Sequence, residues 1–119
     1  MITTSQAAEF AHHWISAWNS HDLDAIMEHY AEDLEFYSPM VAGLKFNDQG
    51  KITQKTELRS YFQIGLNAYP ELHFELHSVF AGIHSVVIQY TSVKGRLASE
   101  VFELDAAEKV VRVLCHYAN

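Results

Sequence analysis

The first apolar residues of the chain recur with the spacing of a helix. Six of them are separated by alternating steps of three residues and one residue: Ala7, Phe10, Ala11, Trp14, Ile15 and Trp18. This spacing is typical of one buried helix face, so we predict a helix from Gln6 to Asn19. Thr4 or Ser5 is expected to cap its N-terminus, because a side-chain oxygen there accepts hydrogen bonds from the free backbone N–H groups.

A polar segment, Asn19 to Asp22, ends this helix, and Asp22 is a suitable N-cap for a second one. The apolar face predicted for the second helix consists of Leu23, Ile26, Met27 and Tyr30. Leu34 to Ser38 is short and β-prone, and it stops at Pro39, which lacks the N–H that a central strand needs. We predict a strand there that leads into a loop.

The segment from Gly43 to Lys51 holds Asn47, Asp48 and Gly50, a turn cluster that can join two very short strands. A further helix is predicted from Thr56 to Tyr69, before Pro70. Its apolar face consists of Leu58, Tyr61, Phe62, Leu66 and Tyr69.

Four segments after Pro70 have the composition of strands: Glu71–Ala81, Ser85–Val93, Arg96–Leu104 and Lys109–Tyr117. The turns between them are short, so neighbouring strands are expected to form an antiparallel meander. Both faces of this sheet carry apolar residues, which indicates that both are covered. The helices can cover one face, and the other, with Val79, Val101 and Leu114, is left to a second subunit. We therefore expect an α+β fold and a homodimer through the sheet.

Length and charge narrow the class of protein further. The chain has 119 residues, the size of a single domain, and a formal net charge of −7 with no cluster of Lys and Arg. Nucleic acid and anionic membranes are therefore not expected as partners. No apolar run reaches the roughly 20 residues of a spanning helix, and Met1 to Gln6 does not resemble a signal peptide. With a single cysteine, Cys115, the chain has no internal disulfide, and we expect a cytoplasmic protein.

Three segments, Trp14–Ile26, Tyr30–Pro39 and Leu58–Phe62, stand out together with the predicted order of helices and strands. Over nearly the whole chain they resemble the nuclear transport factor 2-like superfamily, specifically its SnoaL-like branch. The resemblance implies a curved antiparallel sheet wrapped around the N-terminal helices into a cone with an apolar pocket at its open end. It also implies a dimer through the outer side of the sheet. The superfamily includes isomerases, cyclases, hydrolases, dehydratases and members without catalysis, so the fold alone does not indicate a function.

Three positions can be compared with the family's functional residues, and only one of them keeps the family's residue type. Ser38 stands where the superfamily's ketosteroid isomerase has the aspartate that abstracts a proton, and a hydroxyl cannot replace that carboxylate base. Trp14 stands where the isomerase has an oxyanion-binding tyrosine, and an indole N–H donates one hydrogen bond but is a weaker acid. Glu100 matches the family's acid on the penultimate strand.

Glu100 is the candidate general acid or base. On a strand it shares a face with Arg96, Ala98, Phe102 and Leu104. Apolar neighbours would desolvate the carboxylate and raise its pKa, which suits a proton donor or a hydrogen-bond donor. The alternative is a glutamate paired with Arg96 or another cation on the outer face.

The candidate ligand-binding residues are mostly aromatic. Eight rings are expected in or around the pocket: Trp14, Trp18, Tyr30, Phe36, Tyr61, Phe62, Phe102 and Tyr117. The resemblance places Ser38 and Met40 near its rim. Plain core packing is the alternative for each ring. Cys115 is expected in a buried apolar wall, which disfavours the nucleophilic thiolate.

No metal or cofactor site is expected. His73, Glu75 and His77 alternate along a predicted strand, but residues two apart are about 6.6–7 Å from each other, which is wide for one ion. His12 and His13 fall on the polar side of the first helix. No metalloprotease motif, Cys-x-x-Cys or phosphate-binding glycine loop occurs.

Three functions remain open on these grounds. The first is a small-molecule-binding protein whose pocket takes an apolar or aromatic ligand with one polar group near Glu100. The second is an isomerase, cyclase, dehydratase or hydrolase that uses Glu100 as acid or base, with Tyr30 or Tyr117 as partner. The third is a dimerising interaction module without a ligand.

Overall fold

A computed structural model describes all 119 residues and begins with two helices. Helix α1, Thr4–Asn19, has Thr3 as its N-cap rather than Thr4 or Ser5. Thr3 is preferred because Gln6 lies three residues after it, so that each side chain accepts a hydrogen bond from the other residue's backbone N–H. Helix α2, Leu23–Met27, is capped by Asp22 as predicted. No helix is long and apolar enough to cross a membrane.

The middle of the chain differs from the prediction in three details. Tyr30 starts strand β1, Tyr30–Tyr37, instead of ending α2. Pro39 opens a short helix α3, Pro39–Gly43, capped by Ser38, because proline fits the first helical position. Only one short strand follows, β2, Lys51–Gln54, and it leads directly into helix α4, Lys55–Ala68.

The second half is the predicted set of strands. They are β3, Glu75–Ala81, β4, Ser85–Thr91, β5, Leu97–Leu104, and β6, Val110–Tyr117, with a single 3-10 turn, η1, Val93–Gly95, between β4 and β5. β3 to β6 form the predicted antiparallel meander in a six-stranded sheet of order β2-β1-β6-β5-β4-β3. Within it β1 runs parallel to β6, a pairing that the sequence did not indicate.

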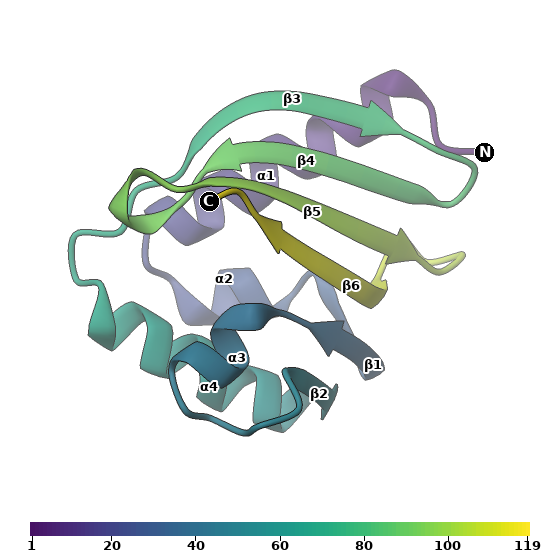
Figure 1. The fold of residues 1–119 in the computed structure, drawn as a ribbon. Helices are drawn as coiled ribbons and strands as arrows, with labels where there is room; N and C mark the ends of the chain where they lie inside the picture. The colour runs from purple at the N-terminus through teal and green to yellow at the C-terminus, as the bar shows by residue number, and fades with distance from the viewer.

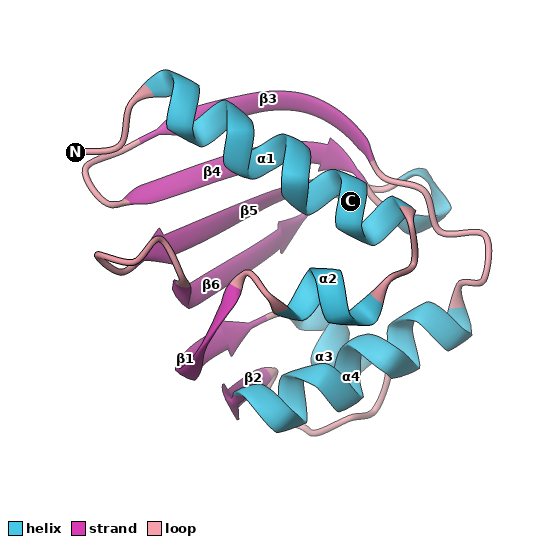
Figure 2. Cartoon of the chain, turned by 180° about the vertical axis from the view of Figure 1, so that it is seen from behind, coloured by secondary structure: helices cyan, strands magenta, loops and turns pink.

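The sheet curves around the helices without closing (Figure 1). Seen from behind, α1 crosses the concave face of the longer strands, and α2 and α4 lie over the end that β1 and β2 form (Figure 2). This is the expected α+β cone fold of the nuclear transport factor 2-like type. The core fills the space between the sheet and the helices, and 27 buried hydrophobic residues form one cluster there.

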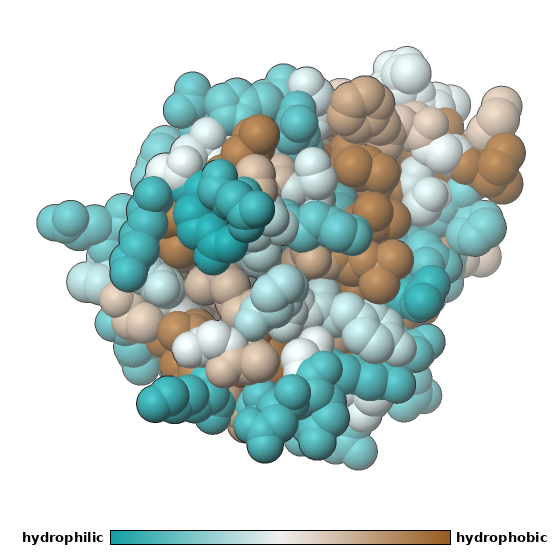
Figure 3. Space-filling model, viewed as in Figure 1, coloured by the Kyte–Doolittle hydropathy of each residue, from teal (hydrophilic) through white to brown (hydrophobic).

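The outer face of the sheet carries a row of apolar side chains. Phe80, Val87, Val101 and Leu114 are direct cross-strand neighbours, and Phe80 is 56% exposed. The apolar surface on this side of the molecule is visible in Figure 3. Val79, which we predicted on this face, instead pairs with the fully buried Ile88 and packs against the core. A bulge between Leu76 and Ser78 shifts the alternation of β3 and so turns Val79 inward.

The segment between α4 and β3 is fastened to the end of α1. Asn19 accepts a hydrogen bond from the backbone N–H of Phe74 at 2.6 Å and donates one to the carbonyl of the same residue at 3.0 Å. The ring nitrogen Nε2 of His21 lies 2.7 Å from the carbonyl oxygen of Leu72. These bonds fix Leu72 and Phe74 against the helix, where both side chains are buried.

Candidate functional site

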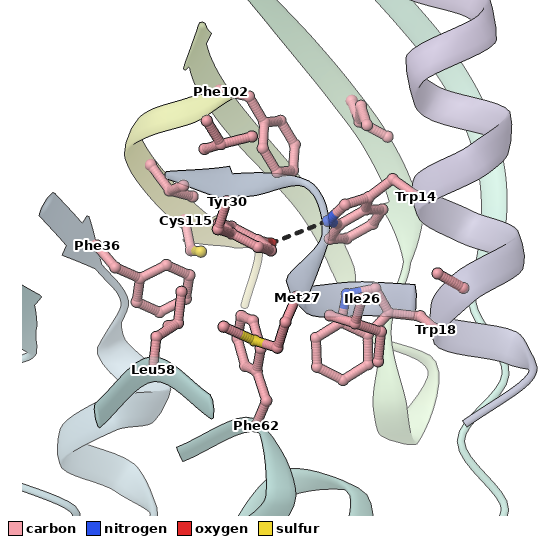
Figure 4. Close-up of a cluster of buried hydrophobic side chains, with 14 of the residues drawn as sticks. Trp14, Trp18, Ile26, Met27, Tyr30, Phe36, Leu58, Phe62, Phe102 and Cys115 are labelled. Carbon is pink, nitrogen blue, oxygen red and sulfur yellow. Dashed lines mark hydrogen bonds between the residues drawn. The ribbon is translucent and has the colours of Figure 1, made fainter. Parts of the chain in front are cut away.

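The interior of the cone is filled mainly by aromatic rings. Trp14 lies at its centre, 2% exposed, with its ring centroid 5.2 Å from those of Tyr90 and Phe102 and 5.7 Å from that of Phe74. Its indole N–H donates a hydrogen bond of 3.1 Å to the hydroxyl oxygen of Tyr30 (Figure 4). Most of these rings therefore pack on one another, as the core-packing alternative supposed.

A cavity of about 60 Å³ remains between the rings. That is room for a few water molecules or a small organic group, well below the roughly 300–1,000 Å³ of pockets for drug-sized ligands. Fourteen of the seventeen residues that line the cavity are hydrophobic. The full lining consists of Trp14, Trp18, Phe36, Met40, Leu44, Tyr61, Phe62, Gly65, Tyr69, Leu72, Phe74, Tyr90, Ser92, Val93, Glu100, Cys115 and Tyr117.

The structure brings most of the candidate residues to this cavity. Eight of them line it: Trp14, Trp18, Phe36, Met40, Tyr61, Phe62, Glu100 and Tyr117. Three do not. Tyr30 lies behind Trp14 as its hydrogen-bond acceptor, and Phe102 is fully buried between Phe10 and Trp14. Ser38 is buried, and its hydroxyl accepts a hydrogen bond from the backbone N–H of Met40 at the start of α3.

Sequence reasoning missed several lining residues, of which Tyr90 matters most. On β4 the buried residues are Val86, Ile88 and Tyr90, so strict alternation was a signal that could have placed the Tyr90 ring inside. Leu44, Gly65, Leu72 and Phe74 carried no comparable signal, because helix ends and connections bring them to the cavity.

Glu100 is the only charged residue in the cavity wall. It is 4% exposed, and its Oε1 accepts a hydrogen bond of 2.7 Å from the hydroxyl of Tyr90. Burial raises the pKa of this carboxyl to about 7, while hydrogen bonds from Tyr90 and Cys115 partly offset the rise. Near neutral pH the carboxyl is therefore divided between its acid and its base form.

No cation neutralises this carboxylate, so the alternative of an ion pair with Arg96 is wrong. Glu100 takes part in none of the ion pairs of the structure, which all lie at the surface. The guanidinium of Arg96 lies over the ring of Tyr117 instead, 4.8 Å from its centroid. Arg96 precedes β5, so the alternation of side chains along the strand does not place it on the same face of the sheet as Glu100.

The hydroxyl and thiol groups around Glu100 are held in their protonated forms. Burial raises the pKa of Tyr61, Tyr90 and Tyr117, and the Glu100 carboxylate raises each further. Burial likewise raises the pKa of the Cys115 thiol, as expected for a cysteine in an apolar wall. These groups can donate hydrogen bonds to a ligand, but none is a nucleophile at neutral pH.

The histidines lie away from the cavity. His12 and His13 are exposed on α1, and His73 is exposed ahead of β3. His77 Nε2 lies 2.6 Å from the hydroxyl oxygen of Thr91 on the neighbouring strand. No group of three metal-ligating side chains converges anywhere in the chain.

Comparisons with known proteins agree with this geometry. The model of the SnoaL-like domain family matches residues 11–117. A SnoaL-like protein of unknown function from Burkholderia thailandensis E264 is 43% identical over the full length of both chains, with a TM-score of 0.94. A search of the curated proteins finds no match.

Two more distant structures share the fold. The epoxide hydrolase/cyclase-like enzyme SalBIII, which has a role in pyran ring formation in the polyether salinomycin, is 18% identical over 99% of this chain and 95% of its own, with a TM-score of 0.76. An NTF2-like protein of unknown function from Cytophaga hutchinsonii ATCC 33406 is 16% identical over 99% and 92%, with a TM-score of 0.70. The family match covers most of the sequence, the cone is that of its relatives, and the chain belongs to the SnoaL-like family.

Proposed function

We propose that this protein binds a small apolar or aromatic molecule in the cavity of the cone, with one polar group of the ligand at Glu100. The observation that carries the proposal is a buried carboxyl in a mainly apolar wall, without a cation to neutralise it. Keeping such a group costs free energy, because burial penalises its charged form. A ligand that donates a hydrogen bond to Glu100, or accepts one from its protonated form, would offset that cost.

The size of the cavity limits the part of the ligand that enters it. About 60 Å³ suits a single ring or a short chain once neighbouring side chains adjust. Met40, Leu44 and Val93 belong to the wall and are only partly buried, so they are the side chains that can move most easily. We therefore expect affinities in the range of small fragments rather than of large cofactors.

Gly65 offers a direct test of the proposal. It lies one helical turn from both Tyr61 and Tyr69 on the face of α4 that lines the cavity, and a Cβ added to it meets no atom within 4 Å. Gly65→Leu is therefore expected to fill the cavity while α4 remains intact. The matched control is Gly43→Leu, because a Cβ at Gly43 is equally free but Gly43 is exposed and outside the cavity wall.

The measurement is a titration of the wild type and both variants with phenol and with acetophenone, in which ¹⁵N–¹H NMR reports the binding of each probe. We expect Gly65→Leu to weaken binding at least tenfold and Gly43→Leu to leave it unchanged. If all three proteins bind the probes equally, the probes bind elsewhere on the surface and the proposal is contradicted. No binding of either probe to the wild type would contradict the proposal.

A second candidate function, acid–base catalysis, is favoured by the pKa of Glu100 near 7 and by its hydrogen bond to Tyr90. A carboxyl that changes protonation near neutral pH can remove and return protons efficiently. Its partner would be Tyr90, rather than Tyr30 or Tyr117. With 5-nitrobenzisoxazole, which opens when a base takes the C3 proton and its N–O bond breaks, the rate should rise as Glu100 deprotonates. A rate that Glu100→Gln leaves unchanged would exclude this role.

We also propose that two chains pair through the apolar row Phe80, Val87, Val101 and Leu114. The row is continuous across four strands and is not covered by any element of this chain. Val101→Glu places a charge in its centre and is expected to yield a monomer at micromolar concentration by light scattering. Gln89→Glu, on the same face but outside the row, should remain dimeric. A wild type that is monomeric at this concentration would contradict the pairing.

A further inference from the structure

The aromatic cavity adjoins a second hollow on the surface. A groove of about 490 Å³ lies between the connection from α4 to β3 and the η1 turn. Four residues belong to the walls of both spaces: Tyr69, Leu72, Ser92 and Val93. These residues lie between the two spaces, and because Tyr69 and Val93 are only partly buried, a molecule in the cavity can reach the groove when their side chains move.

Ser92 is a polar group without a partner at this junction. It is 5% exposed, and its backbone N–H donates a hydrogen bond of 2.6 Å to the carbonyl of Arg96. Its hydroxyl forms no hydrogen bond with another residue and is accessible from the space around it, whereas Trp18 Nε1 is the only fully enclosed side-chain polar atom without a partner. Because Ser92 borders both spaces, this hydroxyl is available to a ligand that passes from one to the other.

One cation, Lys94, belongs to the groove wall, and a second, Arg96, lies two residues further along the chain over a ring of the cavity wall. Lys94 Nζ lies 6.0 Å from the ring centroid of Tyr69, and the guanidinium of Arg96 lies 4.8 Å from that of Tyr117. Both rings line the cavity. Neither cation has a carboxylate within ion-pair distance, so the charge of each is free to attract an anionic ligand.

The backbone holds Lys94 in this position. Its φ of 58° is in the left-handed region, which a side chain other than glycine, asparagine or aspartate adopts at a cost. Gly95 follows with a φ of 70°, and hydrogen bonds from Ser92 and Arg96 close the turn on both sides. The turn therefore fixes the direction from which Lys94 approaches the ring of Tyr69. The groove wall also contains His73 and Glu71, both exposed, and Glu71 forms no ion pair with Lys94.

We propose that cavity and groove form one site for a small carboxylic acid with an apolar body. The apolar part occupies the aromatic cavity, and the carboxylate lies at the junction, where the Ser92 hydroxyl donates a hydrogen bond to it and Lys94 and Arg96 attract it. This inference rests on the proposed function and adds the class of ligand. Glu100, at the cavity wall, forms a hydrogen bond with a polar substituent at the opposite end of such a molecule.

The test compares two probes that differ only in the end group, 3-phenylpropionate and 3-phenylpropan-1-ol, by titration calorimetry at pH 7.5. The wild type is expected to bind the acid about fivefold more tightly than the alcohol, the ratio that one partly exposed charge contact provides. Lys94→Gln should remove most of this preference and leave the affinity for the alcohol unchanged. Ser92→Ala should weaken the acid more than the alcohol.

Lys45→Gln is the matched control, because Lys45 is also an exposed lysine in the left-handed region, with a φ of 60°, and it lies outside both walls. It should leave the preference for the acid intact. Equal affinities for acid and alcohol in the wild type, or an equal loss of preference in Lys45→Gln and Lys94→Gln, would overturn the inference and leave the proposed function standing. Binding of neither probe would overturn both.

Discussion

Trp14→Ala is expected to lower the free energy of unfolding by about 3–5 kcal/mol, the cost typical of removing a large buried ring. Trp14 is 2% exposed and contacts the rings of Trp18, Phe74, Tyr90 and Phe102. Its removal leaves a hole at the centre of the cone and takes the indole donor away from Tyr30. Urea unfolding followed by far-UV circular dichroism measures the change.

Ile64→Ala is the control for this experiment. Ile64 lies on α4 but is 40% exposed, so its loss should change the free energy of unfolding by about 0.5 kcal/mol or less. A loss below 1 kcal/mol for Trp14→Ala would mean that Trp14 is not the centre of the core.

Glu100→Gln is expected to remove a large pH dependence of stability. The carboxyl has a pKa of about 7 in the folded protein, against an ordinary value of 4.5. A raised carboxyl pKa means that the folded state binds the proton more tightly than the unfolded state. The stabilisation from this tighter binding is fully present below about pH 4.5, and it is lost as the pH rises through 7. At about 1.4 kcal/mol per pKa unit, the loss amounts to about 3 kcal/mol.

The measurement is urea unfolding of wild type and Glu100→Gln between pH 5 and pH 8. Glutamine keeps an oxygen that accepts the Tyr90 hydrogen bond but never ionises, so the variant should be similar to the wild type at pH 5 and clearly more stable at pH 8. The two proteins differ only at this residue, so the pH effects of all other groups cancel in the difference. A difference in stability that is constant over this range would show that Glu100 is not desolvated.

Much of the fold could be predicted because its signals are local. The helical spacing from Ala7 to Trp18 and the short turns after Pro70 each specify contacts between residues or strands that are close in the sequence. The parallel pairing of β1 with β6 joins residues as far apart as Phe36 and Val113, and no local pattern encodes it. The inward turn of Val79 depends on a bulge, which shifts the alternation without a glycine or proline to mark it.

The candidate site was predictable only in part. The direction of Glu100 follows from strand alternation, and its burial follows from the apolar neighbours Ala98 and Phe102. The size of the cavity does not follow from the number of rings, because Trp14 and Phe102 fill space by packing against each other. Ser92 and Gly65 border the cavity through the shapes of a turn and a helix that only the three-dimensional structure shows.

Native mass spectrometry of gently purified protein tests the central claim most directly, when wild type and Gly65→Leu are compared and the released small molecules are identified. Because the expected affinities are those of fragments, we predict that the wild-type chain carries one molecule of 3-phenylpropionate or acetophenone when the compound is added in excess, and that the Gly65→Leu chain carries none. An unoccupied wild type that also gains no mass when 3-phenylpropionate or acetophenone is added in excess would contradict a ligand-binding cavity.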